Sequence, residues 1–270
     1  MLLPRPQNET AEEVACSPRA HVQLLNIGMC FGHTEILRNI SLEVQRGQIA
    51  VIIGGSGTGK TTLLRMMIGL LRPTSGAMRI DGQDIAQMDR RELKRARAKW
   101  AMVFQYSALL DSLTVFENVA LPLREHEALK PAEETFRVRE MLQSLKLSGT
   151  EQRYPNELSG GMRKRVAIAR ALIRRPSLIA YDEPSSGLDP ITARLVDELI
   201  LSTRDRFGVT SIVISHDMAQ ASKLADCAFV LDHGQLVAAG KLDELRARPG
   251  SLAARFFDAS RVESPQVPAQ

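Results

Sequence analysis

GGSGTGKTT, residues 54–62, is the stretch that decides the fold of this 270-residue chain. It follows the apolar run of residues 49–53 and precedes a helical pattern that begins at Leu63. A glycine, four further residues, Gly-Lys and then Ser or Thr, set between a strand and a helix, is the pattern of a phosphate-binding loop. Its glycines let backbone N–H groups surround a phosphate, and the helix start adds partial positive charge. The stretch predicts a nucleotide triphosphate site in an α/β fold rather than an ordinary glycine-rich turn.

The side chains of this loop have separate expected tasks. Lys60 can reach the β- and γ-phosphates, and the Thr61 hydroxyl can ligate Mg²⁺. Lys60 is therefore counted among the catalytic residues as well. The residues expected to bind the nucleotide are Gly54, Gly55, Ser56, Gly57, Thr58, Gly59, Lys60, Thr61 and Thr62.

A pair of acids, Asp182 and Glu183, follows the apolar run of residues 178–181. The carboxyl ends of buried parallel strands form the ligand-binding edge of an open α/β sheet. Asp182 is expected to hold Mg²⁺ there, and Glu183 to accept a proton from the water that attacks the γ-phosphate. The alternative is an acid pair that caps the following helix through Pro184. The phosphate loop earlier in the chain favours the metal and base interpretation.

Composition limits the function classes. The chain is 44% apolar and carries 35 Lys and Arg against 31 Asp and Glu, a formal charge of +4. This mild excess suits phosphate ligands or a nearby anionic membrane, and it does not by itself indicate nucleic acid. No apolar run reaches the roughly 18 residues of a membrane span, and residues 1–19 lack the apolar core of a signal peptide. We therefore expect a soluble subunit whose membrane role depends on a partner.

The pattern along the chain predicts one main domain. Residues 1–19 are expected to be disordered, residues 20–245 to form the domain, and residues 246–270 to be an extension with a disordered end. Alternating strands near the start predict an antiparallel β portion. Residues 113–147 have helical periodicity, which we expect to break at Pro122 and to restart near Pro131. They belong to a longer segment, about residues 107–175, that contains no sheet-like run. This segment is predicted to be an inserted helical subdomain.

A second anion-binding pattern lies in residues 158–162, Leu-Ser-Gly-Gly-Met, at the predicted start of a basic helix. One chain cannot easily bring this second site to its own phosphate loop. From about residue 22 to residue 240 the sequence resembles the ATP-binding subunits of ABC transporters, whose signature is Leu-Ser-Gly-Gly-Gln. The basic run 163–165 then fits a solvated helix face better than a nucleic-acid surface, and no nucleic-acid partner is expected.

The resemblance implies ATP as the nucleotide and assigns further roles. Gln105 resembles the Q-loop glutamine, which approaches Mg²⁺ and the attacking water and faces the membrane partner. His216 resembles the switch histidine that contacts the γ-phosphate, and Phe31 stands where an aromatic ring stacks on adenine. Asp189 belongs to the segment that resembles the D-loop, residues 186–189, and is expected to contribute to nucleotide binding. The signature residues expected to bind nucleotide are Ser159, Gly160 and Gly161.

The same resemblance implies a partner for each site. Two copies of the chain pair head to tail, so that residues 54–61 of one and residues 159–161 of the other enclose each ATP. An ATPase of this kind drives integral membrane permease subunits. The implied fold is a P-loop NTPase core with an N-terminal antiparallel β portion and the inserted helices.

Met162 stands where the family usually has glutamine, and this difference helps to identify the subfamily to which the chain is similar. Together with residues 107–119 and 121–126 it is similar to the ATPases of MCE-type (Mla) phospholipid transporters. That similarity implies lipid transport between inner and outer membranes, an MCE-domain lipid-binding partner, and a peripheral position on the cytoplasmic face of the inner membrane.

Three alternatives remain open at this stage. They are an importer ATPase for a polar solute, an ABC ATPase that works outside transport, and a catalytically silent regulatory subunit. The presence of Lys60, Asp182, Glu183 and His216 together argues against the silent subunit.

Overall fold

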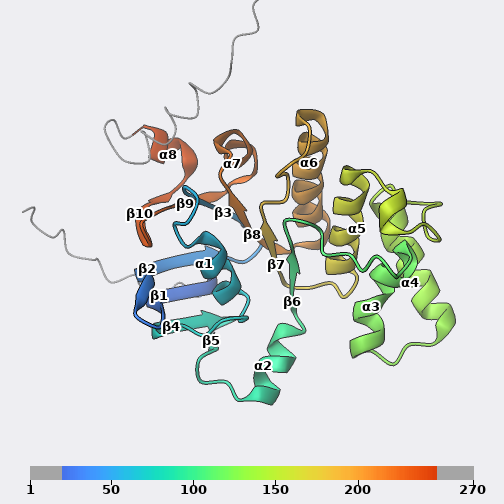
Figure 1. Cartoon of the computed structure of the whole chain (residues 1–270). Coiled ribbons are helices and arrows are strands. Elements are labelled where there is room, and N and C mark those ends of the chain that lie inside the picture. The colour runs from blue at the N-terminus through green and yellow to red at the C-terminus, as the bar shows by residue number, and fades with distance from the viewer. Residues whose placement is uncertain (1–19, 248–270) are drawn as a thin grey trace, which may run out of the picture.

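The computed structural model describes residues 20–247. The predicted segment 1–19 and nearly all of the predicted extension 246–270 lie outside the described residues. Within the described part, the strands form two sheets (Figure 1). The four-stranded sheet has the order β2-β1-β4-β5, with β1 (Ala20–Phe31), β2 (Thr34–Gln45), β4 (Ser75–Ile80) and β5 (Gln83–Asp84). The predicted N-terminal antiparallel portion is confirmed, because β1 pairs antiparallel with β2 and with β4.

The second sheet has six strands in the order β10-β9-β3-β8-β7-β6. Its members are β3 (Ile49–Ile53), β6 (Trp100–Val103), β7 (Leu178–Asp182), β8 (Thr210–Ser215), β9 (Cys227–Asp232) and β10 (Gln235–Gly240). All neighbouring pairs are parallel except the β9–β10 hairpin. This is the predicted α/β core.

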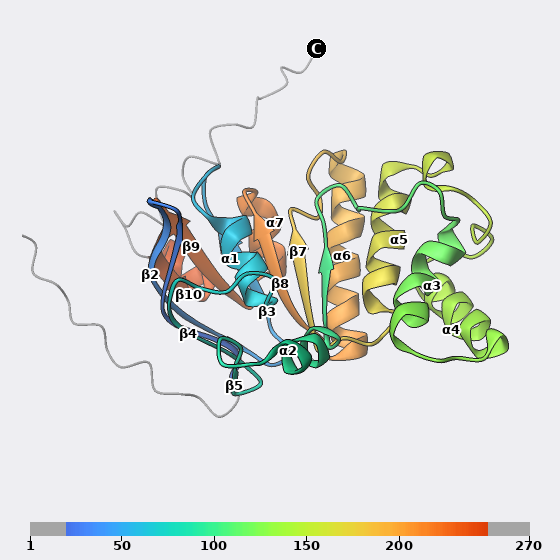
Figure 2. The same cartoon turned by 60° about the horizontal axis from the view of Figure 1, so that its bottom comes forward.

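The helices in the described residues connect and cover these strands (Figures 1 and 2). They are α1 (Lys60–Met67), α2 (Arg90–Arg97), α3 (Val115–His126), α4 (Pro131–Ser144), α5 (Gly160–Leu172), α6 (Pro190–Phe207), α7 (Met218–Leu224) and α8 (Leu242–Arg246), with a 3₁₀ turn η1 (Pro155–Glu157). None of them is long and apolar enough to cross a membrane.

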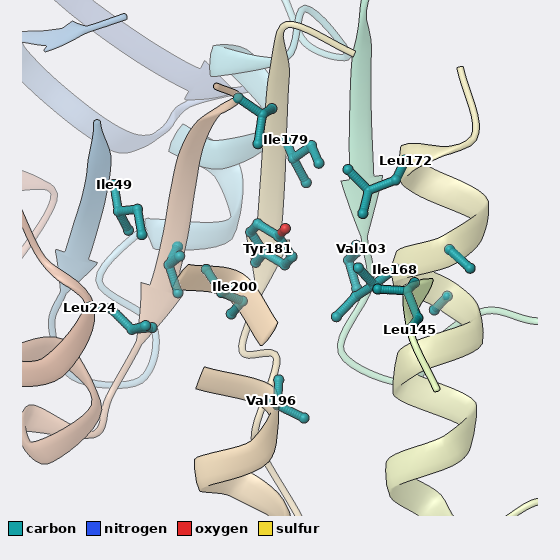
Figure 3. Packing of buried hydrophobic residues seen from close by; sticks show 14 of the residues in the cluster. Ile49, Val103, Leu145, Ile168, Leu172, Ile179, Tyr181, Val196, Ile200 and Leu224 are labelled. Carbon is teal, nitrogen blue, oxygen red and sulfur yellow. The ribbon is translucent and has the colours of Figure 1, made fainter. Parts of the chain in front are cut away.

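The central strands are continuous apolar runs because both of their faces are buried. In β3, Ala50 and Ile52 join the cluster that contains α1 and the four-stranded sheet. The alternate residues Ile49, Val51 and Ile53 join the larger cluster on the other face, which includes residues of α3 to α7. Figure 3 shows part of this second cluster, with residues of β3, β7, α5, α6 and α7 close together.

The register places the carboxyl ends of four strands in one row. Ile53 of β3 lies opposite Ser215 of β8, and the neighbouring Ile214 lies opposite Asp182 of β7. Val103 of β6 pairs with Tyr181, one residue before Asp182. The loops that follow β3, β6, β7 and β8 therefore start at the same edge, as the sequence predicted for Asp182 and Glu183.

The helical segment differs from its prediction at Pro122. Helices α3, α4 and α5 lie together beyond α6 (Figure 2), but α3 runs through Pro122 to His126, and the break falls at residues 127–130. A proline inside a helix costs about 3 kcal/mol. Ala120 and Leu123, on either side of Pro122, are fully buried, and this packing offsets the cost. The restart at Pro131 is as predicted.

A buried histidine ties the two sheets together and gives a pH-dependence prediction. His21 Nδ1 lies 2.6 Å from Thr210 Oγ1, and its Nε2 lies 3.2 Å from Asp81, which also pairs with Arg46. Burial lowers the pKa of His21 from its usual 6.5, Asp81 opposes the shift, and Arg46 adds to it. Because the unfolded chain then binds the proton more tightly, the free energy of unfolding should fall as the pH drops below about 6.5.

Urea unfolding at pH 7.5 and pH 5.5 measures this effect. The His21→Asn variant, which cannot titrate, should lose less stability between the two pH values than the unchanged protein. An equal loss in both proteins would show that His21 is not the group responsible.

Candidate nucleotide site

The predicted phosphate loop, residues 54–62, follows β3 and leads into α1. Gly57 and Gly59 adopt left-handed backbone angles, φ 77° and 97°, which glycine reaches without strain. At Gly54 a side chain is excluded because an added Cβ would lie 2.3 Å from the Leu231 carbonyl oxygen. Lys60, the first residue of α1, donates from Nζ to the carbonyl oxygens of Gly54 and Gly55 at 2.9 and 2.6 Å. Its ammonium therefore lies over the loop.

A cavity of about 650 Å³ opens beside this loop. Its lining residues are Ile36, Ser56, Gly57, Gly59, Lys60, Thr61, Thr62, Glu183 and His216. The volume is within the usual range for a small-molecule site. The fold thus brings Glu183 and His216, from the ends of β7 and β8, to the same cavity as the loop. Ile36 on β2 was not predicted, since nothing marks it in sequence beyond an apolar residue of a strand.

The residues around Asp182 fit Mg²⁺ held together with a nucleotide. Burial raises the pKa of Asp182 and Glu183 raises it further, while Arg65, the Thr61 hydroxyl and Lys60 act against this. Thr61 and Asp182 therefore lie near each other and offer hard oxygen ligands, which Mg²⁺ prefers. In residues 20–247 no group of three His, Cys, Asp or Glu could hold a metal by protein ligands alone. Mg²⁺ is commonly bound with one or two protein ligands plus phosphate oxygens and water.

Three side chains from three strand ends meet at Glu183. Gln105 Nε2 donates to one carboxylate oxygen at 3.2 Å, and His216 Nδ1 lies 3.3 Å from the other. Glu183 itself has a left-handed backbone, φ 45°, which is uncommon for a residue other than glycine. Its N–H donates to Ile214 O at 3.2 Å, so the neighbouring strand holds this conformation. The arrangement can place a carboxylate, a histidine and an amide around one water molecule.

The remaining predicted residues do not line this cavity. Ser159 caps α5 by accepting from the Met162 N–H at 3.3 Å, and Gly160 and Gly161 form the first turn. Asp189 caps α6 through the N–H groups of residues 191 and 192, and hydrogen bonding to Thr192 lowers its pKa. Phe31 is half-exposed at the end of β1. The signature residues are therefore not part of the cavity beside this chain's own phosphate loop.

The signature helix is fixed by packing. An added Cβ on Gly161 would lie 2.6 Å from Thr192 Cγ2, so a larger residue would require the Thr192 side chain or α6 to shift. Met162 packs against the larger core cluster, which explains how an apolar side chain is accommodated at this position.

Comparison with known proteins agrees with this geometry. Residues 37–186 match the sequence pattern of the family described as ABC transporter. The chain belongs to the ABC transporter family. Among relatives of this ABC ATPase is the intermembrane phospholipid transport system ATP-binding protein MlaF of Escherichia coli, 40% identical over 88% of each chain. The methionine import ATP-binding protein MetN of Rhizobium etli is 42% identical over 91% of this chain and 66% of its own length.

Solved structures show the same fold. The ATP-binding cassette MJ0796, a dimer in a post-hydrolysis state bound to ADP and Pi, is 33% identical with a TM-score of 0.74, covering 82% of this chain and 98% of that one. The protein cbiO1 from Clostridium perfringens, part of the ABC transporter complex cbiONQ, is 25% identical with a TM-score of 0.77, covering 89% and 99%. The predicted P-loop ABC ATPase fold is thus confirmed, and the protein is an ATP-hydrolysing subunit of an ABC transporter.

Proposed function

We propose that this ABC ATPase energises the movement of phospholipid between inner and outer membranes, as part of an MCE-type complex. The observation that carries the proposal is the similarity to MlaF, which extends over 88% of both chains. The proposed partners are integral permease subunits and an MCE-domain lipid-binding protein. The proposed location is the cytoplasmic face of the inner membrane, where the subunit is peripheral.

The proposed chemistry uses the residues around the cavity. The backbone of residues 54–59 and the Lys60 ammonium hold the triphosphate, while Thr61, Asp182 and Gln105 hold Mg²⁺. Mg²⁺, when bound, neutralises the charge that develops on the phosphate oxygens. Glu183 accepts a proton from the attacking water, and its contact with Gln105 at 3.2 Å orients the carboxylate. His216 contacts the γ-phosphate.

In the proposed assembly, a second copy of the chain brings its signature residues to the cavity beside the phosphate loop. Two copies pair head to tail, and Ser159, Gly160 and Gly161 of one face the phosphates held by the other, with helix N-terminal N–H groups directed at the anion. Asp189 lies at the subunit contact, and Phe31 stacks on adenine. Residues 20–245 are the proposed ATP-binding domain, with a helical subdomain at about 107–175.

A second candidate function rests on the similarity to MetN. An importer ATPase for a polar solute would use the same ATP site, and the 42% identity to a methionine import protein supports it. The two proposals differ in the membrane partners and in the transported molecule, and they share the hydrolytic mechanism.

Purification of the tagged protein with its own membrane subunits separates the two. We expect an MCE-domain protein, a multi-span permease and phospholipid to co-purify, and phospholipid to stimulate ATP hydrolysis by the complex. As a control, the Lys60→Met variant should give the same complex without hydrolysis. Recovery of a polar-solute permease, with stimulation by its binding protein and solute instead of lipid, would overturn the lipid assignment.

A further inference from the structure

Lys164 is a buried cation that the proposed mechanism does not use. It lies on α5, five residues after Ser159, and its exposed fraction is 4%. Lysine is almost never fully buried unless its ammonium has a partner. Burial lowers the pKa of Lys164, and the carboxylates of Asp182 and Glu183 oppose that shift. The ammonium is therefore close enough to the hydrolytic acids to feel their charge.

The partner of this ammonium is a backbone oxygen. Lys164 Nζ donates to the carbonyl oxygen of Gln105, the residue whose side chain reaches Glu183 at 3.2 Å and Ser186 Oγ at 3.3 Å. A cation that fixes the main chain of Gln105 also fixes the point from which its amide extends. The contact chain thus runs from α5 through Gln105 to the proposed base.

A second cation of α5 holds the next part of the same loop. Arg170 donates to the carbonyl oxygens of Ser107 and Ala108 at 3.0 and 2.8 Å. Both residues have left-handed backbones, φ 63° and 46°, although neither is glycine. Such conformations are held against a cost on the order of 1–3 kcal/mol each and persist when surrounding contacts fix them. Helix α5 therefore donates hydrogen bonds to three carbonyl groups of the loop after β6, all within residues 105–108.

The same helix begins with the signature. Ser159 caps α5, and the helix continues without interruption to Leu172, so the signature and Lys164 move as one body. In the head-to-tail dimer of the proposed function, residues 159–161 face the nucleotide held by the other copy. Gln105 faces the nucleotide held by its own copy. The Lys164–Gln105 contact then links the two sites directly.

We propose that Lys164 is a positioning residue that fixes Gln105 to the signature helix and thereby couples the two ATP sites of the dimer. The inference rests on the head-to-tail pairing of the proposed function. The partner in this coupling is the second copy of the chain. Because the bond needs a donor at the Gln105 carbonyl, an amide of similar length at position 164 can serve in place of the ammonium.

The test compares three variants of the full chain in ATP hydrolysis. Lys164→Met removes the donor, and Lys164→Gln keeps one. Both replacements are one atom shorter than lysine, so they differ from each other mainly in the donor. Lys130→Met, at an exposed lysine ahead of α4, is the matched control. For Lys164→Met we expect kcat about tenfold lower with KM for ATP nearly unchanged, and a Hill coefficient that falls from above 1 towards 1. Lys164→Gln should recover most of both quantities, and the control should match the unchanged protein.

Three results would overturn the inference. The first is a Lys164→Met protein with an unchanged Hill coefficient. The second is an equal loss in the Met and Gln variants. The third is a loss that follows a lowered melting temperature, which would mark a purely structural lysine. The proposed function fails separately: an unchanged protein that neither dimerises with ATP nor hydrolyses it cooperatively would remove the head-to-tail dimer itself.

Discussion

The Glu183→Gln variant is expected to hydrolyse ATP about 10²- to 10⁴-fold more slowly than the unchanged protein, with ATP binding intact. Glutamine has the size of glutamate, so the left-handed backbone at position 183 and the contacts with Gln105 and His216 lose little of their geometry. An amide cannot accept the proton of the attacking water. ATP binds the closed dimer more tightly than the open one. Without hydrolysis, the ATP-bound closed dimer should therefore accumulate.

Phosphate release and size-exclusion chromatography with and without ATP measure the two parts of this prediction. Glu140→Gln, at an exposed acid of α4, is the matched control and should retain both turnover and the unchanged protein's elution behaviour. Rapid multiple-turnover hydrolysis by the Glu183→Gln protein would exclude Glu183 as the base. Loss of ATP binding would instead show that Glu183 contributes to binding ATP before hydrolysis.

Much of the fold could be predicted because its central elements carry strong local patterns. The limits of β3 agree with the predicted apolar run of residues 49–53 to the residue, since this run is continuous and ends at the glycines of the phosphate loop. The sequence of the phosphate loop is equally informative about its structure. Gly57 and Gly59 adopt left-handed backbone angles, and at Gly54 there is no room for a side chain. These signals need no knowledge of the rest of the chain.

The departures arise where distant packing outweighs a local rule. Pro122 was expected to end a helix, yet the buried residues beside it keep α3 intact to His126. The prediction of a solvated basic face at residues 163–165 is wrong for Lys164, which is buried and donates to the Gln105 carbonyl in the loop after β6. The Gln105–Glu183 contact joins residues 78 positions apart and depends on the register of β6 against β7. Nothing in either local sequence specifies that register.

The strongest test of the composite site mixes two inactive proteins. Lys60→Met removes the ammonium over the phosphate loop, and Gly160→Asp places a carboxylate at the signature, where it would repel the partner's triphosphate. An added Cβ at Gly160 first meets Leu188 at 3.4 Å, an ordinary contact, and an acid in the first helical turn is favourable for α5. Each variant alone should fold normally and lose at least about 10²-fold in turnover.

In a heterodimer of the two variants the defects fall in the same site. The Lys60→Met loop faces the Gly160→Asp signature, and the other site joins an intact loop to an intact signature. An equal mixture with free exchange contains about half heterodimers, so activity should rise to at most about a quarter of the unchanged protein's and far above either variant alone. Differently tagged copies, purified through both tags, would give the activity per heterodimer. No recovery in such heterodimers would contradict the head-to-tail site, because a chain that used its own signature would carry one defect in every site.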